Sequence, residues 1–228
     1  MSPFNLLSPS HIIVCIMCFV AIVYIPKYFK NSTDTAKLLL SYSIIFLMLI
    51  NQGMDFYREG YLDEWKLGLP LHLCDFASLA GALYLLTKKR EFFLFAFFFG
   101  IAGGTMSILT PDVIYGFPHV PYIQNEIGHS LIILSVSYGI IIDNQRPYLK
   151  DCHRVLIFAS FLLAIMYLVN YLLGPPANYW YLAEKPMGDN ITSFMRPEPF
   201  HVIDLYALAV ILVYLMYLPY YLKDRSKQ

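Results

Sequence analysis

The side chains that could do chemistry in this chain stand near the starts of three apolar segments. Each segment opens with one histidine and one carboxylate three residues apart: His72 and Asp75, Glu126 and His129, and His201 and Asp204. Ionisable groups are costly in lipid, so they are usually paired with one another and tied to function. Because side chains three residues apart share a helix face, each pair points in one direction. We expect the three pairs to line one buried site.

Cys74 adds a thiol to the first of these pairs. A thiol is a weak nucleophile until a base makes it a thiolate. On a helix, Cys74 would lie about 200° around the axis from His72, which is therefore poorly placed as its base. A histidine from another helix, His129 or His201, is the better candidate, with a carboxylate orienting the imidazole as in a catalytic triad.

Three other roles remain open for the same groups. A structural polar network would pin the helices together without chemistry. A transporter or binding protein would use the groups to hold a solute or relay protons. A metal site is suggested by Glu126 and His129, since Glu-x-x-His pairs on facing helices form di-metal carboxylate sites. Such a site needs two of these pairs, and the chain has only one in that order. The predicted reaction uses no metal and no other cofactor, and an intramembrane metal-dependent hydrolase stays open as an alternative.

Composition places these residues in a membrane. Of the 228 residues, 58% are hydrophobic and 14% are charged, whereas soluble domains are about 45–50% apolar. The formal net charge is zero, and no basic patch is present that would attract nucleic acid. We predict an all-α, multi-pass membrane protein that forms a single integral membrane domain over residues 1–228. Its expected partners are membrane phospholipids and not nucleic acid.

Seven stretches are long and apolar enough to cross a hydrocarbon core about 30 Å thick. They cover residues 11–29, 36–53, 68–86, 91–109, 126–142, 152–173 and 199–222. The first ten residues carry no Lys or Arg, so a cleavable signal is not indicated and the first span should act as an anchor. The fold class predicted from the sequence is therefore a bundle of seven transmembrane helices.

Basic residues are divided unevenly between the two sides of this bundle. Of the 16 Lys and Arg residues, only Arg58, Lys66, Lys185 and Arg196 lie on the side that holds the His, Asp and Glu pairs. The positive-inside rule then places the N-terminus outside and the C-terminus in the cytoplasm. We expect a cell-membrane protein whose chemistry-bearing helix ends face outward.

Several motifs resemble those of a known family. The run LPLHLCD at 69–75 resembles the signature of the YwaF-like bacterial membrane proteins. Further matches are Gly103-Gly104, LTPD at 109–112, GFP at 116–118, His129, and NYWYL at 178–182 followed by Lys185-Pro186. This family is similar to the eukaryotic transmembrane protein 164 family, whose activity is phospholipid acyl transfer through a cysteine. The last helix opens with EPFH at 198–201 instead of an aromatic-proline-aromatic run, which is a departure from the pattern.

The resemblance implies an acyltransferase or acyl hydrolase that acts on phospholipids through an acyl thioester on Cys74. Position alone suggests His129 as the base, oriented by Glu126 or Asp112, with Asn170 or Gln52 donating to the oxyanion. The residues predicted to be catalytic are Cys74, His129, His72 and Asp75. The residues predicted to bind the substrate are Asp112, Glu126, Asn170, Lys185, His201 and Asp204.

Overall fold

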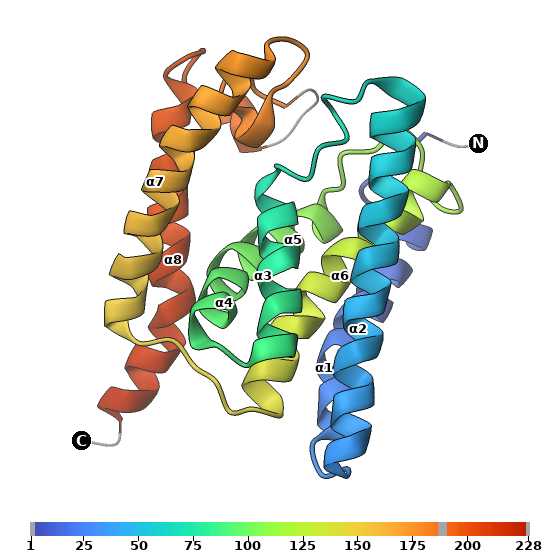
Figure 1. The fold of residues 1–228 in the computed structure, drawn as a ribbon, viewed down its shortest axis with the longest axis vertical. Helices are drawn as coiled ribbons and strands as arrows, with labels where there is room; N and C mark the ends of the chain where they lie inside the picture. Colours follow the sequence, from blue (N-terminus) through green and yellow to red (C-terminus); the bar gives the residue numbers. More distant parts are fainter. Residues whose placement is uncertain (1–2, 187–190, 227–228) are drawn as a thin grey trace. The chain divides into compact units, whose positions relative to one another are not determined.

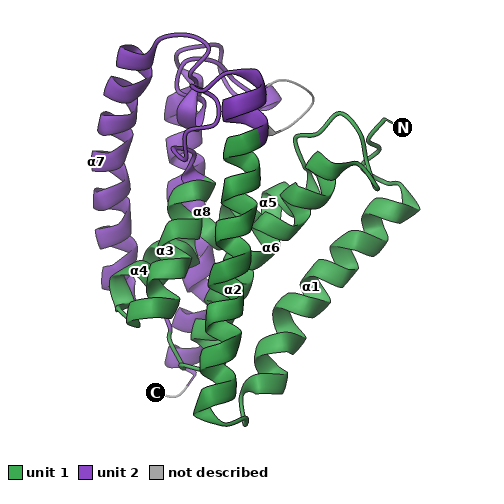
Figure 2. Ribbon diagram, turned by 45° about the vertical axis from the view of Figure 1, so that its right-hand side comes forward, with its two compact units in different colours: residues 1–57, 74–145 green, residues 58–73, 146–228 purple. Residues whose placement is uncertain are grey.

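The structure, a computed structural model, describes residues 3–186 and 191–226. These residues form helices and connecting loops, with a single isolated bridge between Pro3 and Tyr115 and no strand among them. The all-α prediction is confirmed. Contacts divide the chain into two compact units, residues 1–57 with 74–145 and residues 58–73 with 146–228 (Figure 2). The prediction of a single domain over residues 1–228 stays a prediction.

Unit 1 contains six α-helices and one π-helical segment. They are α1 (Pro9–Phe29), α2 (Asp34–Asp55), α3 (Leu73–Thr87), α4 (Arg90–Phe95), η2 (Ala96–Gly100), α5 (Ile101–Leu109) and α6 (Val120–Ile141) (Figure 1). Local sequence explains where α1 and α2 begin. Ser8 caps α1 by accepting a hydrogen bond from the backbone N–H of His11, and Thr33 caps α2 by accepting one from Ala36.

Unit 2 is built around two long helices, α7 (Leu149–Leu173) and α8 (His201–Arg225), with the short segments η3 (Tyr179–Tyr181) and η4 (Ile191–Phe194) between them. The π-helix η1 (Phe56–Asp63) continues α2 into this unit. Polar contacts pin α7 to α8 at three levels: Arg146 with Asp224 at 2.8 Å, His153 with Tyr214 at 3.0 Å, and Ser160 with Tyr206 at 2.8 Å. From one level to the next, the residue number of the first partner rises and that of the second falls, so the two helices are antiparallel.

The chain is a multi-pass membrane protein. In the part of the chain that the structure describes, five helical stretches are long and apolar enough to cross a membrane: Pro9–Phe29, Asp34–Asp63, Arg90–Leu109, Leu149–Leu173 and His201–Arg225. α3 is a shorter apolar helix, and α6 carries several polar side chains in its first turns. Each predicted span coincides with helical structure, while the count of seven crossings stays a prediction.

The third predicted span begins later than expected. Residues 64–72 form turns and bends, and α3 begins at Leu73 instead of residue 68. Pro70 has no N–H to donate and restricts the residue before it, so a helix is disfavoured through this stretch. His72 therefore precedes the helix, and the expectation that His72 and Asp75 share a helical face is wrong. The fifth span also differs, because α6 begins at Val120 instead of residue 126, with a proline in its first turn.

Two glycines set the register of α3 against α6. A Cβ atom on Gly81 of α3 would collide with the side chain of Ser135 on α6. A Cβ atom on Gly139 of α6 would come within 2.9 Å of the ring of Tyr84 on α3. Both numbers rise together from the first pair to the second, so α3 and α6 run in the same direction where they touch.

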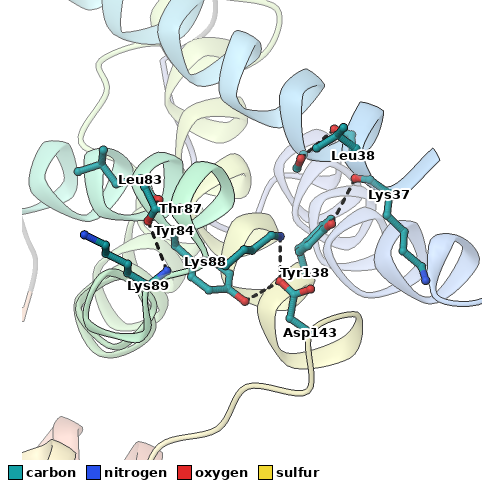
Figure 3. Close-up of polar contacts among 10 residues, drawn as sticks. Lys37, Leu38, Leu83, Tyr84, Thr87, Lys88, Lys89, Tyr138 and Asp143 are labelled. Carbon is teal, nitrogen blue, oxygen red and sulfur yellow. Dashed lines mark hydrogen bonds and ion pairs between the residues drawn. The ribbon is translucent and has the colours of Figure 1, made fainter. Parts of the chain in front are cut away.

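A polar network ties the ends of these helices that lie away from Cys74 (Figure 3). Asp143, just after α6, accepts hydrogen bonds from the Tyr84 hydroxyl at 2.7 Å and from Lys88 Nζ at 2.9 Å. The Lys88 ammonium also lies 4.2 Å from the ring centroid of Tyr138 on α6. The Tyr138 hydroxyl donates to the backbone oxygen of Lys37 on α2 at 3.2 Å. This network fixes the ends of α2, α3 and α6 together.

The contact at Gly139 gives a stability prediction. Gly139→Ala should destabilise unit 1 by about 1–3 kcal/mol, because the added methyl meets the buried rings of Phe93 and Tyr84 at 2.8–2.9 Å. Gly103→Ala on α5 is the matched control, since a Cβ there meets nothing within 4 Å. Thermal unfolding in detergent should show a lower Tm for Gly139→Ala only. Equal Tm values for both variants would contradict the packing described for α3 and α6.

Candidate active site

Cys74 is the second residue of α3 and carries a half-buried, free thiol. Cys74 lies seven residues before Gly81, the position at which α3 touches Ser135 of α6. The carboxylates of Asp75 and Asp55 both act electrostatically on the thiol. Cys74 and Asp75 thus share the first turn of α3 in unit 1.

His129 has its proton fixed by a hydrogen bond within its own helix. Its Nδ1 lies 2.9 Å from the backbone oxygen of Asn125. A carbonyl oxygen only accepts, so Nδ1 must carry the hydrogen in the neutral imidazole, and the lone pair is on Nε2. A neutral histidine with its lone pair on Nε2 has the protonation state that a general base requires.

Polar side chains from α2 and α6 form a cluster around the carboxylate of Asp55. Gln124 Nε2 donates to Asp55 Oδ1 at 2.7 Å, and Asn51 Nδ2 donates to Asp55 Oδ2 at 3.4 Å. Asn51 also lies against Gly128, where an added Cβ would be 2.5 Å from the Asn51 Nδ2. The two amides hold the Asp55 carboxylate in one orientation. Gly128 is small enough to let the Asn51 side chain approach α6.

The side chain of Glu126 has different neighbours from the side chain of His129. Its side chain is buried, and its Oε1 accepts from Asn125 Nδ2 at 3.5 Å, while its Oε2 has no hydrogen-bond partner among the described residues. The Glu126 carboxylate acts electrostatically on Cys15 and Cys18 of α1. The structure therefore gives Glu126 no hydrogen bond to His129, and its orienting role toward that residue has no geometric support.

In unit 2, two of the predicted site histidines meet at the loop that contains η3. The Nε2–H of His201 donates to the backbone oxygen of Tyr181 at 2.7 Å, and the His201 side chain is completely buried. The ring of His72 lies 4.9 Å from the ring of Tyr179 and 6.0 Å from that of Tyr181. These contacts bring His72 and His201 to one segment of unit 2.

Asn170 holds this loop through both polar atoms of its side chain. Asn170 Nδ2 donates to the backbone oxygen of Tyr179, and Asn170 Oδ1 accepts from the backbone N–H of Tyr179, both at 2.9 Å. Trp180 Nε1 donates to the backbone oxygen of Leu71 at 2.9 Å. The aromatic motif at 178–182 therefore anchors the segment before α3, and the Asn170 amide serves that anchor.

The remaining predicted substrate-binding residues make contacts of their own or are exposed. Asp204 accepts from the backbone N–H of Arg196 at 2.9 Å and pairs with its guanidinium at 2.5 Å. Lys185 Nζ donates to the backbone oxygen of Met195 at 3.4 Å. Asp112 is exposed in the loop after α5. Asp204 is thus engaged by a loop arginine, although it is only one turn from His201.

Comparison with known proteins places the chain in a family. The family model described as the TMEM164 family matches residues 6–217. The chain belongs to the TMEM164 family. This confirms the resemblance to the transmembrane protein 164 family, while the narrower assignment to YwaF-like proteins stays a prediction. An uncharacterized protein of Treponema pallidum is 24% identical over 157 residues, which cover 69% of this chain but only 64% of that relative, less than two thirds of its length. No solved structure matches the chain.

Within this member of the TMEM164 family, the predicted site residues are divided between the two units. Unit 1 contains Cys74, Asp75 and His129, and in unit 2 both His72 and His201 contact the segment at Tyr181. The convergence of all three Asp/Glu–His pairs on one cavity stays a prediction. In the described part of the chain, no three side chains among His, Cys, Asp and Glu are grouped closely enough to hold one metal ion.

Sequence reasoning left two members of the unit 1 cluster out of the predicted site of this TMEM164-family protein. Gln124 and Asp55 form its shortest hydrogen bond, yet neither was counted among the catalytic or substrate-binding residues. Asn51 and Asp55 are four residues apart on α2, a spacing that puts both on one helix face. That spacing was the available signal, but nothing local to either helix predicts that this face meets Gln124.

Proposed function

We propose that this protein is a membrane-embedded acyltransferase that moves an acyl group from a phospholipid through a thioester on Cys74. The observation that carries the proposal is the free thiol of Cys74 in the first turn of α3, where the unpaired N–H groups of a helix start can support an oxyanion. The base that we propose is His129, whose hydrogen bond to Asn125 leaves the lone pair on Nε2. Membership of the TMEM164 family supports the assignment.

The first half of the reaction forms the thioester. His129 Nε2 takes the proton of the Cys74 thiol while Sγ attacks the carbonyl carbon of the ester. The tetrahedral intermediate then collapses, the ester C–O bond breaks, and the proton on His129 passes to the departing alkoxide. The products are a Cys74 thioester and a lysophospholipid.

The second half reverses these roles with a new acceptor. His129 removes a proton from the hydroxyl of a lysophospholipid, and that oxygen attacks the thioester carbonyl. The C–S bond breaks and the proton returns to Cys74, which restores the free thiol. With water as the acceptor, the same steps amount to acyl hydrolysis.

The charges around Cys74 decide how the proton moves. Asp75 and Asp55 repel an isolated thiolate on Cys74. Proton transfer to His129 is therefore coupled to the attack on the ester. The first backbone N–H groups of α3 have no helical acceptors, and the helix dipole is positive at this end. Both features favour the oxyanion that develops next to Cys74.

The test of this function is the covalent intermediate. Purified protein mixed with phospholipid should gain the mass of one acyl group, located on the peptide that contains Cys74. A transporter or binding protein would bind the lipid and keep the unmodified mass, so the two functions separate in one measurement.

We also propose that the protein lies in the cell membrane with its N-terminus outside and its C-terminus in the cytoplasm, because 12 of its 16 basic residues fall on the side of the C-terminus. A fluorescent protein fused after Gln228 should fluoresce, and alkaline phosphatase fused at the same point should be inactive. Active phosphatase with a dark fluorescent fusion would reverse the orientation.

A further inference from the structure

Glu126 is a buried carboxyl group that the reaction at Cys74 does not use. Its side chain on α6 is 2% exposed, and it acts electrostatically on Cys15 and Cys18 of α1. It also acts on Tyr122, which lies one turn earlier on α6 and is completely buried. Glu126 therefore lies in the seam between α1 and α6, beside a helix that is able to cross a membrane.

The Tyr122 hydroxyl gives its hydrogen to His11 and not to Glu126. His11 Nε2 lies 3.1 Å from the backbone oxygen of Leu109, which only accepts, so Nε2 carries the hydrogen of the neutral ring. His11 Nδ1 then accepts from the Tyr122 hydroxyl at 2.8 Å. A hydroxyl has one hydrogen to donate, so Tyr122 has none left for the carboxyl group.

The other donors near Glu126 are also committed to backbone oxygens. The Cys15 thiol donates to Ile108 at 3.4 Å. Asn125 Nδ2 donates to Ser107 at 3.1 Å and reaches Glu126 Oε1 only at 3.5 Å. Glu126 Oε2 has no hydrogen-bond partner among the described residues. The carboxyl group thus accepts one long hydrogen bond, whereas an ionised carboxylate is stabilised by two or three good ones.

The helices of the seam also lack a permanent positive charge that could pair with Glu126. The sequences of α5 and α6 contain no Lys or Arg. The one Lys in α1 is Lys27, nine residues after Cys18 and therefore about 13 Å further along the helix. A buried carboxylate without a partner is costly, and such a group stays neutral by keeping its proton.

The polar part of the seam ends inside unit 1. Its three levels are His11 with Tyr122, Cys15 with Glu126, and Cys18 with Ser130. Beyond them, Ile22 and Pro26 continue the buried face of α1, and Ile133 and Leu134 are buried on α6. These apolar side chains have no groups that could pass a proton further. The seam can therefore hold a proton but offers no path across the membrane.

We propose that Glu126 is a proton-binding site that couples protonation to the packing of α1 against α6. The carboxyl group holds a proton while α1 is packed, and it loses the proton when α1 moves away and water reaches the seam. The ligand is the proton itself, because one carboxyl group with thiols beside it does not offer the several oxygen ligands that a hard metal cation needs. The site does not rest on the proposed acyl transfer.

Infrared spectroscopy of the protein in an ester-free detergent tests the site directly, because the C=O stretch of a protonated carboxyl group is resolved from the bands of carboxylates. At neutral pH the unchanged protein should show this stretch, and Glu126→Gln should lose it. Glu91→Gln is the matched control and should keep it, since the Glu91 side chain is exposed in the first turn of α4. No difference between the spectra of Glu126→Gln and the unchanged protein would overturn the proposal.

The coupling to α1 is tested by thermal unfolding at a series of pH values. A carboxyl group that holds its proton more firmly in the folded protein stabilises the fold at low pH, and this stabilisation is lost as the pH rises. From neutral to alkaline pH, the Tm of the unchanged protein should therefore fall more steeply than that of Glu126→Gln, whose amide cannot ionise. Equal slopes would contradict the coupling.

A second variant covers the case in which Glu126→Gln does not give a monodisperse protein. Glu126→Met also removes the ionisable group and keeps a side chain of similar length, so it should lose the same infrared stretch and show the same shallow slope. Cys74→Ser should behave as the unchanged protein does in both measurements. Acylation of Cys74 is measured separately, so failure of the proton site leaves the proposed reaction untouched.

Discussion

Replacing Cys74 with serine should leave the protein folded and remove both the acyl adduct and the transfer of the acyl group. A thiol with an ordinary pKa of about 8.5 gives up its proton to a histidine, whereas an alcohol is far less acidic and needs a stronger base. In the Cys74→Ser protein, His129 would face a hydroxyl that it cannot activate well. The mass of the protein after incubation with phospholipid should therefore equal that of the untreated protein.

Cys18→Ser is the matched control for this substitution. Cys74 and Cys18 are both free and half-buried, but Cys18 lies in the middle of α1, away from the first turn of α3. The control should form the adduct as the unchanged protein does. Full acyl transfer by Cys74→Ser would end the thioester mechanism. An adduct that moved to another cysteine would locate the nucleophile elsewhere in the chain.

Changing His129 to glutamine should slow formation of the thioester by a factor on the order of 10²–10⁴, the usual contribution of a general base. Glutamine keeps a polar side chain of similar reach but cannot take the thiol proton at neutral pH. The measurement is a single-turnover time course of the Cys74 adduct, stopped by acid and followed by mass spectrometry. The final extent of acylation should approach that of the unchanged protein at long times.

His153→Gln provides the comparison, because His153 is on α7 of unit 2 and its Nδ1 lies 3.0 Å from the Tyr214 hydroxyl. Its acylation rate should match that of the unchanged protein. A His129→Gln protein that is acylated at the normal rate would remove His129 from the reaction. The carboxylates of Asp75 and Asp55 would then be the next bases to test.

The sequence by itself determined which segments are helical and that the protein crosses a membrane. In hydrocarbon every backbone polar group must be satisfied within the segment, so an apolar stretch of sufficient length has little choice but to be a helix. This is why each of the predicted spans coincides with helical structure, from α1 to α8. The helix starts were predicted less well, because α3 begins at Leu73 instead of residue 68 and α6 at Val120 instead of residue 126. Depth along a helix follows from counting residues, at about 1.5 Å each.

Only the tertiary structure decided which way each side chain faces. Glu126 and His129 are one turn apart, yet the first faces α1 and the second bonds to Asn125 beside α5. His201 and Asp204 have the same spacing, but one is buried against Tyr181 and the other is paired with Arg196. Spacing fixes the angle between two side chains on a helix and leaves the rotation of that helix open.

That rotation is set by packing against neighbours that are distant in the sequence. Gly128 admits the side chain of Asn51, and Gly139 admits the rings of Phe93 and Tyr84, so α6 can fit in only one orientation. The same contacts bring Gln124 to Asp55 across 69 residues of sequence. No local pattern on α2 or α6 contains this information, because close approach of two helices depends on the shapes of both surfaces at once.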